Sequence, residues 1–447
     1  MKKLLSLLMI LSLVLSGCSA KSFTTTSPLS NSSTGSLALP QSTSTTGDAS
    51  DPNSDTSSSP QTDASSGSVF DPTDWNSVVA AAKGTTVTHV GYGGDDALNE
   101  WIMGPFRQTL KSKYDITLEY VQGLEFPGQL AAEKKAGVTR GSYDTMWING
   151  LNFKTLKEND LLYGSYNQYL PQFKAAIDET AHDTQFDFTF PIEGYETPFS
   201  TAQLVFIHDA AVTPDPPTNV TKLLEFAKAH PGALTYPQAE DFTGAAFIRT
   251  LIYDLLGHEQ FMTMPADYET VRQAVEPAMD YLRSLNPYLW NEGKTFPREL
   301  TEVDNMFING ELLMMMSYGP YDVGGKIKKG IYTQTTEAFL FEKGTVANTS
   351  YYSIPFNSPN PAGAMVAINE MISPKMQLAK LAIAEEPFVT DLTRITPSQK
   401  ELFAEVDLGP NNVPSEIMAA KRLPEYSSAI EQIITRIWLL EVVGKTN

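Results

Sequence analysis

The most restrictive feature of the sequence is a regular alternation of strand-like and helical segments between residues 87 and 148. Segments 87–92, 116–121 and 143–148 have strand composition, whereas segments 98–114 and 126–136 carry apolar residues at helical spacing. Strands that alternate with helices pair in parallel, because each helix returns the chain to the same end of the sheet. The sequence therefore predicts an α/β fold, with ligands bound beyond the carboxyl ends of its strands.

The rest of the chain predicts further elements and a second domain. We expect strands at 203–208 and Leu234–Tyr236, and helices at 220–229, 245–256 and 268–285, with Thr218 or Asn219 as the N-cap of the first helix. Met306 and Met314–Met316 are assigned to the core, and the last 70 residues are expected to be mostly helical. The chain from about Asp71 onward is too long for one core, so two domains are expected.

The amino terminus predicts export and attachment to a lipid. Lys2 and Lys3 precede the apolar run Leu4–Leu15, which leads through small residues to Cys18. A charged start followed by a short apolar run is typical of a secretory signal, here residues 1–17. Small residues before one cysteine match the lipoprotein box, so Cys18 is the predicted lipidation site. A single cysteine also excludes an internal disulfide and a cysteine-based metal cluster.

Composition predicts a disordered tether before the folded part and argues against binding to nucleic acid. Residues 18–70 are rich in Ser and Thr, so we expect them to form a disordered tether between the lipid and the folded body. The formal net charge is -20, which argues against binding nucleic acid through a broad basic face. Beyond the signal, no stretch approaches 18 uninterrupted apolar residues, so no other membrane-spanning helix is expected.

Motifs for catalysis are missing from the sequence. There is no Gly-x-Ser-x-Gly elbow, and Gly293-Lys294-Thr295 lacks the first glycine of a P-loop because Tyr288 occupies that position. The turn after the first strand has Asp96 where a dinucleotide motif needs glycine. We therefore predict no catalytic residue, cofactor or metal. A secreted hydrolytic, carbohydrate-active enzyme remains an alternative, since its paired carboxylates would meet only in the folded chain, and so does a surface display protein.

The predicted strand ends carry aromatic and small polar side chains of the kind that line pockets for polar organic solutes. Trp147 and Tyr318 are expected to stack on a solute, Asn149 and Ser200 to form hydrogen bonds with it, and the glycine turn to meet an anionic group. Core packing remains the alternative for each aromatic residue. The ten candidate residues are Gly93, Gly94, Asp95, Trp147, Asn149, Phe199, Ser200, Phe242, Thr243 and Tyr318.

Tyr351 and Tyr352 allow two interpretations. As paired phenolates they would ligate a ferric ion, but no set of His and carboxylate ligands is recognisable beside them in the sequence. The preferred interpretation is a strand that lies over the cleft.

Several segments resemble, in order, the extracellular solute-binding proteins of ABC importers over about residues 85–440. Leu223–Tyr236 with Asp241–Gly244, Phe307–Met316, and Tyr352–Pro355 through Ser373-Pro374 resemble three characteristic parts of that family. The segments Trp147–Gly150, Asn152-Phe153 and Pro191–Glu196 resemble the YnjB-type branch.

This resemblance implies a two-lobed periplasmic-binding-protein type II fold with a hinge and an inter-lobe cleft. It implies a monomeric, extracytoplasmic receptor, anchored by lipid to the cell membrane, that delivers a small polar solute to an ABC permease and its ATPase. The solute is left open among thiamine-like compounds, polyamines and sugars, with iron among the ligands of relatives. Lobe 1 is expected at 71–200 and 318–380, lobe 2 at 201–317, and C-terminal helices, mainly of lobe 2, at 381–447. The expected hinge crossings lie near Thr197–Gln203 and Tyr318–Val323.

Overall fold

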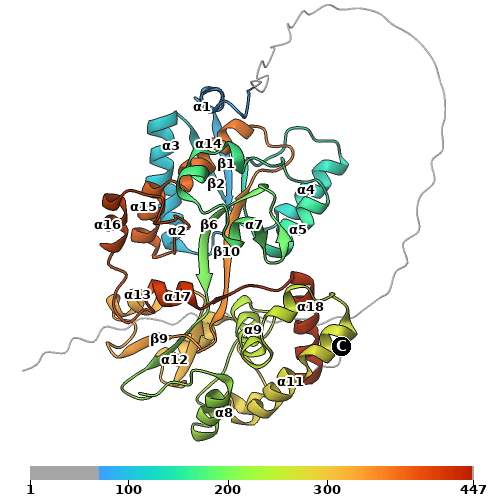
Figure 1. Ribbon diagram of the computed structural model, residues 1–447, viewed down its shortest axis with the longest axis vertical. Helices are drawn as coiled ribbons and strands as arrows, with labels where there is room; N and C mark the ends of the chain where they lie inside the picture. Colours follow the sequence, from blue (N-terminus) through green and yellow to red (C-terminus); the bar gives the residue numbers. More distant parts are fainter. Residues whose placement is uncertain (1–69, 445–447) are drawn as a thin grey trace, which may run out of the picture. The chain divides into compact units, whose positions relative to one another are not determined.

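The computed structural model describes residues 70–444 (Figure 1). The predicted signal peptide, Cys18 and all but the last residue of the predicted tether lie outside the described residues. The described chain begins with α1 (Trp75–Ala82), which the sequence did not predict. The predicted alternation follows: β1 (Thr86–Gly91), α2 (Asp96–Trp101), α3 (Arg107–Tyr114), β2 (Thr117–Gln122), α4 (Phe126–Lys135) and β3 (Thr145–Ile148).

Strand pairing confirms the predicted parallel sheet. β1 pairs in parallel with β2 and with β3. Three strands from distant parts of the chain complete this sheet: β10 (Thr345–Ser353) pairs antiparallel with β3 and with β6 (Glu196–Gln203), and in parallel with β11 (Arg422–Leu423). β1 and β3 therefore end at the same edge, where ligands of such sheets bind.

The predicted helix 98–114 is broken in the middle. Gly104 has φ -93° and ψ -105°, which are not helical, and a π-helical turn (Ile102–Phe106) joins α2 to α3. Pro105 explains the break, because proline supplies no backbone N–H and clashes with the preceding turn. Trp101 and Leu110 nevertheless remain buried on the same side, as the spacing predicted.

One part of the structure, the first lobe, surrounds this sheet. Its core has two clusters, one on each face of the sheet; Phe199 and Tyr352 belong to one cluster, and Met146 and Tyr351 to the other. Helix α1 packs against α14 (Pro361–Met371), and α2 against α15 (Pro374–Ala384). The further elements of this lobe are α5 (Gly150–Glu158), α6 (Pro171–Ala176), α7 (His182–Gln185), β4 (Phe186–Asp187), β5 (Phe190–Pro191), α14 (Pro361–Met371) and α15 (Pro374–Ala384).

The second lobe has its own core and sheet. β7 (Val205–Asp209) lies between β8 (Met314–Ser317) and β9 (Thr336–Phe339). Met314–Met316 are fully buried in this core, as predicted. The helices of this lobe are α8 (Val220–Ala229), α9 (Phe242–Leu256), α10 (Glu259–Met262), α11 (Tyr268–Leu285), α12 (Leu300–Ile308), α13 (Asp322–Lys328) and α18 (Ser428–Ile437). Within residues 70–444, none of the helices combines the length and apolar character needed to cross a membrane.

The predicted strand Leu234–Tyr236 is wrong. Leu234 and Tyr236 are completely buried but belong to no strand. The backbone of this segment makes isolated hydrogen bonds, from Trp290 N to Leu234 O at 2.8 Å and from Leu313 N to Ala233 O at 2.9 Å, instead of a ladder. Burial among helices thus produced an apolar pattern like that of a short strand.

The chain passes between the lobes along β6 and β10, which run side by side (Figure 1). Phe199 on β6 packs in the first lobe, whereas Leu204 just beyond it packs in the second. The second crossing, expected at Tyr318–Val323, instead follows β10, because Tyr318 and Val323 pack in the core of the second lobe. A third connection follows α15 through α16 (Pro397–Ala404), α17 (Ser415–Ala420) and β11 (Arg422–Leu423).

Candidate functional site

The first lobe presents an aromatic pair at the ends of two parallel strands. Tyr92 directly follows β1, Trp147 lies near the end of β3, and their ring centroids are 5.6 Å apart. The side chain of Tyr92 is 49% exposed, so this first-lobe pair faces solvent. Gly93 beside it has φ +81°, and a Cβ there would lie 2.7 Å from Cβ of Gln122. Glycine is therefore required to turn the chain at this strand end.

A carboxylate directly follows the glycine turn. Asp95 is the N-cap of α2, and its side chain accepts a hydrogen bond from Leu98 N at 2.9 Å. A second anion would be repelled by this carboxylate. The geometry therefore does not support the predicted contact between Gly93, Gly94 and an anionic part of the solute.

Asn149 stands between β3 and α5 with a half-buried side chain. It is the N-cap residue of α5, yet in the part of the chain that the structure describes its side chain makes no hydrogen bond. The buried carboxylate of Asp187 accepts the N–H of Gly150 instead. The amide of Asn149 therefore remains available to a ligand.

The second lobe presents a matching aromatic pair. Phe242 is the first residue of α9 and is 42% exposed, and its ring lies 4.9 Å from that of Tyr318 in an edge-to-face arrangement. Asp241 caps this helix by accepting the N–H groups of Thr243 and Gly244. The hydroxyl of Tyr318 donates to Glu425 at 2.9 Å, which fixes the ring from behind. Thr243 is buried beside this second-lobe pair.

Two candidate residues lie inside the first lobe rather than at a solvent-facing wall. Phe199 is 1% exposed, and the Lys380 ammonium sits 4.2 Å above its ring. The hydroxyl of buried Ser200 donates to Pro387 O at 2.9 Å. The alternative of core packing therefore describes Phe199, and the Ser200 hydroxyl is already used within the protein.

Tyr351 and Tyr352 do not form a phenolate pair. Successive residues of a strand point to opposite faces, and these two side chains belong to different core clusters. The Tyr351 hydroxyl donates to Asp183 O at 2.8 Å, and the Tyr352 hydroxyl lies 3.1 Å from Nε2 of His89. Among residues 70–444, no group of three or more His, Cys, Asp or Glu side chains is placed to hold a metal ion.

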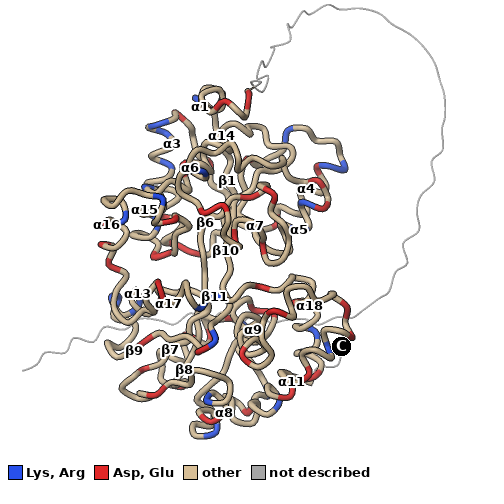
Figure 2. Tube along the Cα trace, viewed as in Figure 1, with Lys and Arg blue, Asp and Glu red and all other residues tan. Residues whose placement is uncertain are grey.

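A buried carboxyl group lies close to the second-lobe pair. Asp322 begins α13, four residues after Tyr318, and its pKa is raised mainly by burial and further by the carboxylates of Asp304 and Asp95. In Figure 2, Asp and Glu lie around β6 and α7, while much of the Lys and Arg lies on outer helices such as α3, α4 and α8.

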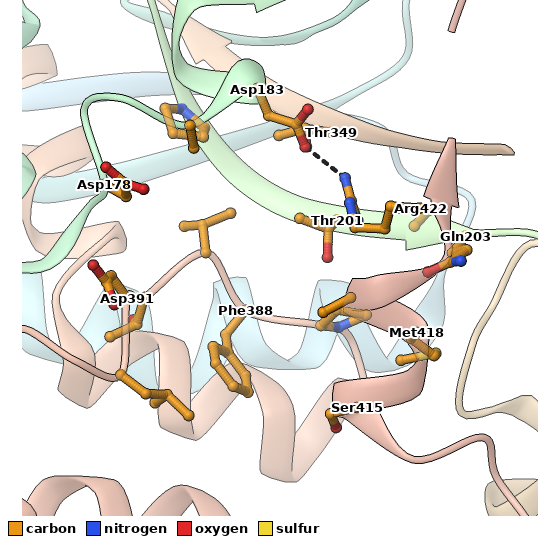
Figure 3. Close-up of a pocket in the computed structure, with 18 of the residues that line it drawn as sticks. Asp178, Asp183, Thr201, Gln203, Thr349, Phe388, Asp391, Ser415, Met418 and Arg422 are labelled. Carbon is orange, nitrogen blue, oxygen red and sulfur yellow. Dashed lines mark hydrogen bonds and ion pairs between the residues drawn. The ribbon is translucent and has the colours of Figure 1, made fainter. Parts of the chain in front are cut away.

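A cavity of about 720 Å³ lies beside β6 and β10, the strands that join the lobes (Figure 3). Its walls come from both lobes and include Asp183, Thr201, Thr349, Tyr321, Met418 and Arg422. None of the ten candidate residues lines it. The cavity is therefore separate from the two aromatic pairs.

The charged residues beside β6 and β10 were not predicted from the sequence. Arg249 is completely buried and pairs with Glu425 and Glu431, and Arg422 pairs with Asp183. Arg249 had a signal, since it is the one basic residue in the mostly apolar segment 245–256. The pair Asp183–Arg422 had none, because 239 positions separate its partners.

Comparison with known proteins identifies the family. Residues 106–393 match the model of the bacterial extracellular solute-binding proteins. The chain is 36% identical to protein YnjB of Escherichia coli (strain K12) over 338 residues, which cover 74% of this chain and 86% of YnjB. This agrees with the resemblance to the YnjB-type branch.

Solved structures show the same fold. A putative extracellular solute-binding protein of Bordetella parapertussis matches with a TM-score of 0.58 and 10% identity, covering 80% of this chain and 98% of the other. The spermidine/putrescine substrate-binding protein PotD of Streptococcus pneumoniae matches with a TM-score of 0.53 and 13% identity, covering 80% and 99%. The predicted two-lobed type II fold is thus confirmed, and the chain belongs to the bacterial extracellular solute-binding proteins.

Proposed function

We propose that the chain is the lipid-anchored receptor of an ABC importer, which captures a small polar solute between its two aromatic pairs and delivers it to a permease. The observation that carries this proposal is that each lobe has an aromatic pair at a strand or helix end with one exposed ring, Tyr92 in the first lobe and Phe242 in the second, while Tyr318 is buried behind Phe242. Tyr92 and Trp147 form the pair of the first lobe, and Phe242 and Tyr318 that of the second.

The proposed capture uses the aromatic faces and one free amide. Trp147 and Tyr318 would contact opposite sides of the solute, and Asn149 would form a hydrogen bond with it. Such a mixture of aromatic surface and few polar groups suits recognition of a polar organic molecule. Phe199, Ser200 and the glycine turn have no direct contact in this proposal.

Lobe closure would follow from contact with both walls. A solute shifts the equilibrium between open and closed forms only as far as its affinity for the two forms differs. β6 and β10 join the lobes, so backbone changes in these strands would accompany closure. No bond is made or broken in this cycle, and an ATPase associated with the permease would supply the energy for transport.

The lipid on Cys18 would keep the receptor beside its permease. Relatives with this fold are named for different solutes, including fructose-6-phosphate, spermidine or putrescine, and iron. The fold therefore does not select among them, and the solute must be found by experiment.

A thermal-shift screen of the full chain against vitamins, amines, sugars and metal ions tests the proposal. A solute at about 1,000 times its dissociation constant adds roughly 4 kcal/mol to the unfolding free energy. We expect at least one compound to raise the melting temperature without being consumed. A broad panel without any shift contradicts the proposal, and turnover of a panel compound favours the hydrolytic alternative.

Two tryptophan variants make the screen specific. Trp147→Ala should abolish the shift caused by a true solute while changing the solute-free melting temperature little, because this side chain is only half-buried. Trp75→Ala is the matched control, since Trp75 is also half-buried and begins α1, before the amino end of β1. If both variants lose the shift equally, Trp147 is not part of the site.

A further inference from the structure

The segment Arg422–Glu425, here called the strap, is held by charged groups of both lobes. Arg422 pairs with Asp183, which lies on α7 of the first lobe. Three positions later, Glu425 pairs with Arg249 on α9 of the second lobe. Arg422 and Leu423 form β11, which pairs in parallel with β10, so the strap adds charged contacts with both lobes beside this connecting strand.

The first-lobe end of the strap is a specific contact. Nη2 of Arg422 lies 2.5 Å from Oδ2 of Asp183, and the hydroxyl of Thr349 donates to the same oxygen at 2.6 Å (Figure 3). The two charged side chains are 27% and 32% exposed. Burial alone would raise the pKa of Asp183, but His182, Arg422 and Thr349 together lower it to about 2. The carboxylate is therefore ionised at neutral pH and available to the guanidinium.

The second-lobe end of the strap reaches the proposed solute wall. Glu425 is buried, and its other oxygen accepts the Tyr318 hydroxyl at 2.9 Å. Tyr318 in turn packs against Phe242. A displacement of Glu425 would therefore move the aromatic ring that is proposed to contact the solute.

The ion pair between Arg422 and Asp183 borders the cavity beside the strap. The cavity of about 720 Å³ has Arg422 and Asp183 in its wall, together with residues of both lobes. In protein interiors, close packing of side chains fixes neighbouring elements relative to each other. Beside the strap, the cavity leaves residues of the two lobes without such packing. The ion pair therefore adds a side-chain restraint on the cavity side to the backbone pairing of β10 with β6 and β11.

We propose that Arg422 is a positioning residue for solute capture, which acts through Asp183 and Glu425 to hold the two aromatic pairs in register. This inference rests on the proposed function. It assigns no solute contact to Arg422, and it predicts that the ion pair changes both the lobe arrangement and the affinity.

Inter-lobe distance in the solute-free protein provides a test that does not depend on the solute. In the full chain with Cys18→Ser, spin labels are attached through Ser112→Cys on α3 and Thr221→Cys on α8, both exposed and in different lobes. The distance distribution is measured for the parent, Arg422→Gln, Asp183→Asn and the double variant. Arg422→Lys, which keeps the charge, tests rescue and replaces Arg422→Gln if the latter does not fold.

We expect Arg422→Gln and Asp183→Asn to broaden the distance distribution equally, and the double variant to broaden it no further. Arg422→Lys should restore part of the parent distribution. Arg272→Gln is the control, because Arg272 pairs with Glu441 within the second lobe and should leave the distribution unchanged. Parental distributions in both single variants would overturn the proposal, as would additive effects in the double variant.

Affinity for a solute from the thermal-shift screen gives the second readout. Each single variant should weaken binding about tenfold, within the usual range of coupling between sites, and the double variant should weaken it by the same factor. A changed distance distribution without any binding compound would contradict only the proposed function. Unchanged affinity alongside a changed distribution would overturn the positioning role while leaving the receptor function standing.

Discussion

In the second lobe, the guanidinium of Arg249 is completely buried against Glu425 and near Glu431, whereas in the first lobe two acids, Asp187 and Glu196, are buried together. Within residues 70–444, neither of these two acids forms an ion pair with a Lys, Arg or His side chain. We call the first set the paired cluster and the second set the acidic cluster. Both lie close to proposed solute contacts, Tyr318 in one case and Asn149 in the other.

The difference determines which cluster responds to pH. Burial raises the pKa of Asp187 to about 8, although the hydrogen bond from Gly150 N–H lowers it. Burial also raises the pKa of Glu196 well above its usual value. Burial would lower the pKa of Arg249, but Glu431 and nearby tyrosines raise it. Arg249 therefore keeps its charge at neutral pH, while Asp187 is largely protonated. An ion pair between Arg249 and Glu425 stabilises the second lobe, whereas protonation of Asp187 stabilises the first.

Arg249→Met should have the largest effect, because it leaves Glu425 buried without its cation. Breaking a buried pair by removing one partner costs about 3–5 kcal/mol. We expect a loss of this size in the free energy of unfolding, measured by urea titration at pH 7.

The double variant Arg249→Met, Glu425→Gln sharpens this prediction. Removing the unpaired charge as well should recover part of the loss, since a neutral glutamine is less costly to bury than a carboxylate. If the double variant is as unstable as the single one, lost packing rather than charge explains the effect.

Asp187→Asn should change the pH dependence of stability. Because the folded pKa is raised above the usual value of 3.8, the folded state binds more protons than the unfolded state between pH 4 and 8. The stability of the parent should therefore fall as pH rises through this range, by up to about 1.4 kcal/mol per pH unit from this group. Urea titrations at pH 5, 6, 7 and 8 should show a shallower decline in the variant.

Asp160→Asn is the control for this series, since that side chain is 93% exposed. It should reproduce the parent slope. A slope that is the same in Asp187→Asn as in the parent would show that Asp187 does not titrate in this window.

Tyr318→Phe should have the smallest of the three effects. The substitution removes one hydrogen bond to a buried carboxylate, worth about 1.5–3 kcal/mol at most, and keeps the ring against Phe242. We expect a loss of about 1–2 kcal/mol in urea titration at pH 7. A loss as large as that of Arg249→Met would mean that Tyr318, not Arg249, is the main partner of Glu425.

Periodicity predicted most of the regular elements. The helices at Val220–Ala229 and Tyr268–Leu285 have the predicted bounds, because their apolar faces and N-caps are local features. The apolar pattern gave a wrong prediction at Leu234–Tyr236, because these residues are buried without pairing to another strand. The second crossing was misplaced because Tyr318–Val323 looks like a turn, and only strand pairing shows that the chain crosses later, along β10.

The candidate site could be predicted only in part, for a similar reason. Trp147 lies near the end of a strand, Asn149 and Tyr318 follow strands, and Phe242 begins a helix; sequence order reveals such positions. Phe199 is also an aromatic residue in a predicted strand-end segment. Its side chain on β6 points into the core of the first lobe, and a single sequence does not show this direction. The strap contacts depend on segments brought together by the complete fold.

Titration calorimetry with a solute from the screen tests the central claim, capture between the lobes, most directly. Trp147→Ala and Phe242→Ala each remove one ring, the first from the first lobe and the second from the second. We predict one bound solute per parent chain and at least about tenfold weaker binding in each variant, as expected for aromatic contacts at the centre of a site. Parental affinity in Phe242→Ala together with lost binding in Trp147→Ala would place the solute on one lobe alone and contradict capture by closure.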